Sequence, residues 1–217
     1  RVRLALEEAV RLRLRADVPV ACYLSGGIDS CAILGFASRL SSNPLRAYTL
    51  SFDHAEYDER ALAEAQAKLS GAEFYRVDIR SEHTADHFAD ALYHAERPFL
   101  NAHSVAKYLL SRAVRDSGIK VVLTGEGSDE IFAGYPHFRR DMVLYGDVGL
   151  SPGARLGLLA ELEASNRVST GILMPQRSVA IESVRSVLGF VPSTLEVWAE
   201  MGKSLLAVAN DDFGRAF

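Results

Sequence analysis

The chain has 217 residues, of which 48% are hydrophobic and 24% are charged, and its formal net charge is −4. These proportions are ordinary for a globular protein with one large domain, and the acidic balance argues against a nucleic-acid surface as the main function. No apolar run approaches the roughly 18 residues that a membrane span requires, and no segment resembles a signal peptide.

The predicted elements alternate between helix and strand. Apolar residues at helical spacing open the chain, and the almost wholly apolar run that follows is typical of a strand buried on both faces of a parallel sheet. Later segments repeat this alternation, with Gly or Pro at several of their ends. In chain order we expect helix 1–16, strand 18–24, helix 30–41, strand 46–52, helix 59–70, strand 74–79, helix 84–95, helix 103–117 and strand 120–124.

This alternation predicts an α/β fold with a doubly wound parallel sheet and right-handed crossovers. From about residue 141 onward the sequence offers helical patterns and loop signals but no convincing strand. We therefore divide the chain into an α/β core over residues 1–140 and a helical segment over residues 141–217. Within the second part, Trp198 and Met201 lie at helical spacing and are expected in the core.

The remaining composition bears on location and metal binding. Cys22 and Cys31 form neither a C-x-x-C pair nor a disulfide framework, which favours a reduced, cytoplasmic protein. Because the chain begins without Met and inside a helical pattern, we expect it to be part of a longer protein. A metal site at His83, His87 and His94 is an alternative, but no Cys or second helix at a suitable spacing supports it, so we favour a polar surface.

The most informative stretch is the loop YLSGGIDS at residues 23–30, between the first predicted strand and its helix. In a doubly wound sheet, ligands bind beyond the carboxyl ends of the strands, where this loop lies. Gly26 and Gly27 allow close approach of the backbone to a ligand, and Ser25 and Ser30 add hydroxyl groups. Together with the amides at the start of the next helix, these features predict an anion-binding loop. It is not a Walker loop, which requires a Lys.

Asp29 needs a separate explanation, because an acidic residue in such a loop would repel the anion unless a cation intervened. We therefore predict that Asp29 binds Mg²⁺, which would also contact phosphate oxygens. The alternative is a Gly-rich turn in which Asp29 caps the following helix.

The segment SGGIDS resembles the S-G-G-x-D-S pyrophosphate loop of the N-type ATP pyrophosphatases. The resemblance implies an adenine nucleotide alpha-hydrolase-like fold, and cleavage of ATP between the α and β phosphates with an adenylated intermediate.

A second acidic loop follows the strand predicted at 120–124. Glu126, Asp129 and Glu130 place three carboxylates in five residues, which is costly unless they meet a cation or a substrate amine. The alternative is a helix N-terminus that favours acidic residues. The segment TGEGSDEIFAGY at residues 124–135 closely resembles the S/T-G-E-G-x-D-E-x-x-x-G-Y signature of the glutamine-hydrolysing asparagine synthetase family.

This resemblance implies a role for each matching residue. The residues implied to hold pyrophosphate are Ser25, Gly26, Gly27, Asp29 and Ser30. The residues implied to share Mg²⁺ are Asp29 and Asp129. The residues implied to lie along the adenosine, ribose or α-phosphate of ATP are Tyr23, Leu24, Leu50, Thr124 and Gly125. Glu126 is implied to be the catalytic residue that takes a proton from attacking ammonia, a task that suits a carboxylate.

The function that the resemblance implies is an ATP-dependent amide-forming ligase, which adenylates the side-chain carboxylate of aspartate and releases AMP and pyrophosphate as ammonia forms asparagine. Ammonia would come from a glutaminase domain upstream, and the family also allows a homodimer. The alternatives are a relative that acts on another carboxylate, in a β-lactam or peptide product, and a non-catalytic nucleotide-binding domain. The family's later R-x-P-F-L-D motif and catalytic lysine are not found here, so we expect a fragment truncated at both ends and inactive alone.

Overall fold

The structure is a computed structural model that describes residues 1–53, 58–99, 102–147, 149–166 and 174–206. The chain forms two compact units, residues 1–126 and residues 127–217. The boundary between the α/β core and the helical segment, expected near residue 141, stays a prediction.

The first unit contains one parallel sheet of four strands in the order β3-β2-β1-β4. On the central strand, Ala21 pairs with Arg46 of one neighbour and with Val122 of the other. The elements are α1 (Val2–Arg13), β1 (Val20–Tyr23), α2 (Ile28–Leu40), β2 (Arg46–Phe52), α3 (Arg60–Leu69), β3 (Glu73–Ile79), α4 (Ser81–Asp86), α5 (Phe88–Ala95), α6 (His103–Asp116) and β4 (Val121–Leu123).

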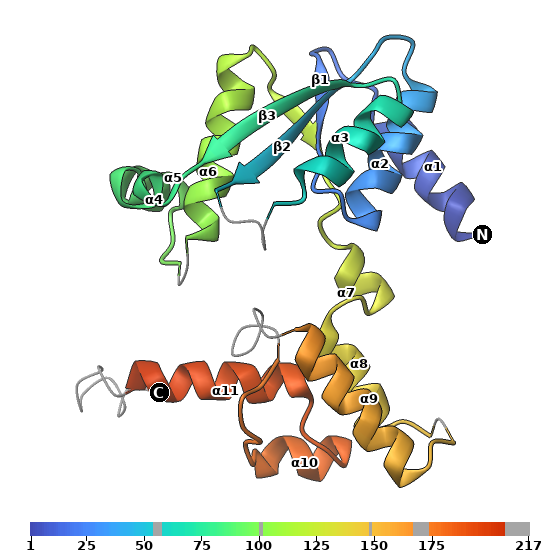
Figure 1. Ribbon diagram of the computed structural model, residues 1–217, viewed down its shortest axis with the longest axis vertical. Helices are drawn as coiled ribbons and strands as arrows, with labels where there is room; N and C mark the ends of the chain where they lie inside the picture. The colour runs from blue at the N-terminus through green and yellow to red at the C-terminus, as the bar shows by residue number, and fades with distance from the viewer. Residues whose placement is uncertain (54–57, 100–101, 148, 167–173, 207–217) are drawn as a thin grey trace. The chain divides into compact units, whose positions relative to one another are not determined.

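Helices cover both faces of this sheet, which confirms the predicted doubly wound α/β fold (Figure 1). On one face, Cys22 and Ala47 of the strands pack with residues of α1, α2 and α3, including Leu34 and Ala63. On the other face, Ala21 and Tyr48 pack with α6. Alternate residues of β1 therefore point into two separate cores, which is why this strand is apolar throughout.

The strand order places a topological switch point between β1 and β4. From β1 the chain steps to β2 and then to β3 by way of α2 and α3, which share one face. It then returns along the opposite face by way of α6 and adds β4 on the other side of β1. A crevice at the carboxyl ends of the strands forms at such a point, and it is the usual ligand position in open α/β sheets.

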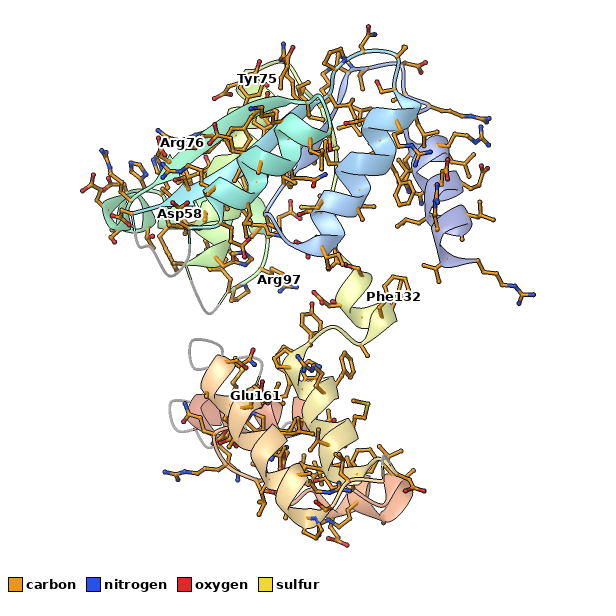
Figure 2. The ribbon with its side chains drawn as sticks, turned by 45° about the vertical axis from the view of Figure 1, so that its right-hand side comes forward. Asp58, Tyr75, Arg76, Arg97, Phe132 and Glu161 are labelled. Carbon is orange, nitrogen blue, oxygen red and sulfur yellow. The ribbon has the colours of Figure 1, made fainter. Side chains whose placement is uncertain are left out.

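Most predicted elements are confirmed, with shifts of a few residues at their ends. The helix predicted over 84–95 is two helices, because the chain turns at His87, where φ is −114° and ψ is 10°. The first of them starts earlier than predicted, where the Arg80 amide donates to His83 Nδ1 at 3.2 Å. Asp58 lies just before α3 (Figure 2), and its carboxylate accepts the amide of Arg60 at 3.3 Å, although the N-cap of this helix is Glu59.

The second unit is helical in its described residues. Its helices are α7 (Ser128–Phe132), α8 (Pro136–Tyr145), α9 (Pro152–Ser165), α10 (Glu182–Leu188) and α11 (Ser193–Leu206). The side chain of Val197 is buried, whereas Trp198 is 65% exposed, so the expectation that Trp198 lies in the core is wrong. Successive residues on a helix point about 100° apart, so Val197 on α11 is buried while the adjacent Trp198 faces solvent. No helix within the described ranges is long and apolar enough to cross a membrane.

A buried polar network holds the start of α11 against α8. Arg140 donates to Glu196 Oε2 at 2.9 Å, and Glu196 is 1% exposed. Asp141 accepts the amide of Ser193 at 3.0 Å and also its hydroxyl. Arg140 and Glu196 are therefore paired as ions, and Asp141 is hydrogen-bonded to Ser193, as burial of charged groups requires.

Candidate functional site

The strand β1 ends in a rigid connection to β2. The Leu24 amide donates to the Tyr48 carbonyl at 2.9 Å, and the Thr49 hydroxyl donates to the Leu24 carbonyl at 2.8 Å. The Leu24 side chain is only 2% exposed, in the core with Cys22 and Leu34. Any contact of Leu24 with adenosine would therefore involve its main chain.

The loop that follows is organised by its own serines. The Ser25 amide donates to Ser30 Oγ at 3.1 Å, and Ser30 Oγ donates to the Gly27 carbonyl at 3.1 Å. The two hydroxyl oxygens of Ser25 and Ser30 lie 3.0 Å apart. Because a serine hydroxyl carries one proton, which Ser30 gives to Gly27, Ser25 is the donor of this pair. Ser30 is buried and shapes the loop, whereas Ser25 is exposed and its hydroxyl also accepts the Gly27 amide at 3.3 Å.

Gly26 and Gly27 bring the loop to the start of α2. Gly26 has a φ of +83°, and a Cβ there would lie 3.2 Å from the Glu59 carbonyl oxygen at the start of α3. Gly27 is the N-cap of α2, and no side chain caps that helix. Asp29 lies in the first turn and is not the cap, so the alternative of Asp29 as a capping residue is wrong. The first amides of α2 thus stay available for an anion.

The second predicted loop meets the first at this point. A Cβ on Gly125 would lie 2.8 Å from the Ser30 amide nitrogen and 2.9 Å from Asp29 Cβ. Real Cβ atoms do not approach other atoms so closely, so the loop after β4 lies directly against the first turn of α2. Two segments almost a hundred residues apart in sequence therefore lie against each other at the switch point.

Asp129 belongs to the second unit, on α7. A Cβ on Gly134 would overlap Asp129 Oδ1, so glycine at that position leaves room for the carboxylate. This explains the spacing of Asp and Gly in the acidic motif. The sharing of Mg²⁺ between Asp29 and Asp129 stays a prediction.

The donor set suits Mg²⁺ held jointly with a nucleotide. Asp29 is half-buried beside the uncapped amides of α2, so its carboxylate oxygens are available close to the position expected for phosphate. Among the described residues, no group of three or more His, Cys, Asp or Glu side chains could hold a metal alone. Mg²⁺ is usually bound by one or two carboxylates together with substrate phosphates and water, and this arrangement fits that pattern.

The structure also shows site residues that the sequence did not indicate. The ammonium group of Lys107, on α6, forms a short ion pair with Glu126 Oε1. The Tyr23 hydroxyl lies 3.0 Å from Ser111 Oγ on the same helix. Burial and the neighbouring Lys107 lower the pKa of His103, so its ring is neutral at pH 7. The i, i+4 spacing of His103 and Lys107 was visible in the sequence, but their position beside the end of β4 depends on the fold.

Of the remaining predicted residues, Leu50 lies half-buried on β2 and packs against α6 together with Val77. His83 and His87 line a separate pocket of about 280 Å³ with Arg112. Their ring centroids lie 6.4 Å apart, and they belong to no candidate metal cluster among the described residues.

Comparisons with known proteins identify a family. A family model described as asparagine synthase matches residues 1–200. Amidase chyE of Penicillium rubens is 42% identical over 156 residues, which cover 65% of this chain and 23% of that protein. Amidase chry2 of Gibberella zeae is 40% identical over 154 residues, covering 64% and 23%. An asparagine synthetase (glutamine-hydrolyzing) of Saccharomyces cerevisiae is 33% identical over 174 residues, covering 63% and 30%.

Among solved structures, the NH3-dependent NAD synthetase of Campylobacter jejuni aligns with a TM-score of 0.45 and 14% identity over 96% of each chain. The matched region spans less than a third of the length of each of the three curated relatives named above, namely 23%, 23% and 30%.

Proposed function

Because the chain belongs to the asparagine synthase family, we propose that it is the nucleotide-binding part of an ATP-dependent amide-forming ligase. The observation that carries this proposal is the close approach of Gly125 to Ser30 and Asp29, which joins the two motif loops at one strand edge. A loop that only bound nucleotide would have no need of the exposed Glu126 beside it.

In the first proposed step, a substrate carboxylate attacks the α-phosphorus of ATP and forms an acyl adenylate. The amides of the loop at residues 25–30 and of the first turn of α2 would bind the departing pyrophosphate. Asp29 and Asp129 would hold Mg²⁺, and the chemistry that this ion supplies when bound is neutralisation of the charge on pyrophosphate. Thr124 and Gly125 would lie along the ribose or α-phosphate, and Tyr23 along the adenosine.

In the second proposed step, an amine attacks the acyl carbon and AMP leaves. The tetrahedral adduct of an amine must lose a proton before it collapses to an amide, and Glu126 would accept that proton. Its side chain is 67% exposed, so an incoming amine can reach it.

The first candidate substrate is aspartate with ammonia as nucleophile, since synthetases named for this reaction match the chain. A second candidate is another carboxylate, because the relatives at 42% and 40% identity are named amidases. We further propose that ammonia comes from a glutaminase domain in the complete protein, that the protein forms a homodimer, and that it works in the cytoplasm, where the free Cys22 and Cys31 stay reduced.

The test is ATP–pyrophosphate exchange by the complete protein, with aspartate and a panel of other carboxylates. We expect exchange that depends on one carboxylate, and a loss of about 10²–10³-fold in Asp29→Asn. Asp17→Asn is the matched control, because Asp17 is exposed and lies outside the site. The proposal is wrong if folded wild-type protein exchanges with no carboxylate, or if Asp29→Asn exchanges as fast as Asp17→Asn.

A further inference from the structure

Lys107 on α6 and Glu126 after β4 form an ion pair. The Glu126 side chain is 67% exposed and lies in the loop after β4, outside any helix or strand. An exposed glutamate populates several rotamers unless a partner selects one of them. Among the described residues of the first unit, Lys107 is the side chain that binds this carboxylate.

Lys107 itself is held by a well-anchored helix. Its carbonyl accepts a hydrogen bond from the Ser111 hydroxyl at 2.8 Å. Ser111 has given its proton to that carbonyl, so the Tyr23 hydroxyl, 3.0 Å away, donates to Ser111 Oγ. On the same helix, Leu110 and Val114 are buried against the sheet. The end of β1, where adenosine is expected, is therefore connected through α6 to the group that holds Glu126.

We infer that Lys107 is a positioning residue, which holds the Glu126 carboxylate in the orientation needed to accept a proton from the attacking amine. This inference rests on the proposed function and goes beyond it, because the resemblance assigns no role to residue 107. Lys107 acts through Glu126 and does not react itself.

The geometry of the pair suits this task. Lys107 binds Oε1 of Glu126, and the two side chains are 40% and 67% exposed. An amine can therefore approach the other carboxylate oxygen from solvent while Lys107 keeps the group in place. The His103 ring is neutral, since burial and Lys107 lower its pKa, so it adds no second positive charge beside the carboxylate.

The experiment measures both chemical steps in the complete protein. Lys107→Met removes the ammonium group and keeps most of the length of the side chain, and Lys107→Arg restores a cation. We expect Lys107→Met to lower kcat for amide formation by about 10–100-fold, the scale of a misplaced catalytic group. ATP–pyrophosphate exchange should fall much less, and Lys107→Arg should recover most of the amide-forming rate. Lys120→Met, an exposed lysine just before β4, is the matched control.

A double-mutant cycle separates positioning from any other role. If Lys107 acts through Glu126, Lys107→Met should cause no further loss in a Glu126→Gln background. Independent, additive losses would overturn the inference, and so would an unchanged amide-forming rate in Lys107→Met. A parallel loss of exchange would also overturn it, because it would assign Lys107 to the adenylate step. Absence of exchange in the wild-type protein would instead refute the proposed function itself.

Discussion

Replacing Gly125 with alanine should separate the two loops that form the candidate site. The added Cβ would lie 2.8 Å from the Ser30 nitrogen, 2.9 Å from Asp29 Cβ and 3.0 Å from the Asp29 carbonyl carbon. All three atoms belong to the first turn of α2, and two of them are backbone atoms. No flexible side chain can move aside, so the loop or the helix must shift.

The size of the effect follows from these distances. Ordinary van der Waals contact begins at 3.4 Å, so the backbone must move by roughly half an ångström or more. The movement is resisted because β1 and β4, which carry the two loops, are paired in the sheet. Overpacking of this kind costs about 1–3 kcal/mol in the free energy of unfolding. A displacement near 1 Å at a reacting group can reduce the rate by about 10²-fold.

The assay combines urea denaturation with ATP–pyrophosphate exchange. Gly125→Ala should lower both the free energy of unfolding and the exchange rate. The matched control is Gly35→Ala in α2, where a Cβ meets nothing within 4 Å. Since Gly35 lies in the interior of a helix, its replacement should stabilise the protein by about 0.5–1 kcal/mol and leave exchange unchanged. Wild-type stability and exchange in Gly125→Ala would refute the close approach of the two loops.

Two further predictions concern buried groups. Arg140→Met should destabilise the protein by about 3–5 kcal/mol in chemical denaturation, because it leaves the carboxylate of Glu196 buried without its cation; a change below 1 kcal/mol would contradict the buried network. Burial raises the pKa of Cys22 from 9.0 to about 12, so native Cys22 should resist alkylation at pH 9. As the pH rises, the thiol of the unfolded chain loses its proton before the native thiol does. The contribution of Cys22 to stability should therefore be full below pH 9.0 and be lost between pH 9.0 and about 12. Denaturation of Cys22→Ala and wild type across this pH range would measure it.

The sequence predicted the layout of the first unit well, for physical reasons. The strand predicted over 46–52 is observed with the same bounds, because Pro44 lies just before it and residues on both of its faces are buried. Glycine-rich turns after two buried strands indicated where a ligand would bind, and the strand order brings these turns together. Local pattern and global fold agree in this region.

What the sequence did not reveal depends on contacts between distant segments. The ion pair of Lys107 with Glu126 joins a helix and a loop, so the spacing of charges within the helix could not predict it. The turn at His87 interrupts a segment whose helical pattern is continuous in sequence. Trp198 matched a helical spacing, but the buried face of α11 carries Glu196 and Val197, and Glu196 binds Arg140 of a different helix.

The order of strands in the sheet also has a consequence for how the chain folds. Ala21 pairs with Arg46, roughly 25 residues away, but with Val122 only after roughly 100 residues. Closing the longer loop costs about 1 kcal/mol more in chain entropy, so β1, β2 and β3 should assemble first and β4 should join them late. During synthesis on the ribosome, the loop at residues 25–30 would therefore exist before Glu126 has been translated. The nascent chain would present the open edge of β1 until then, a surface suited to a chaperone or to mispairing.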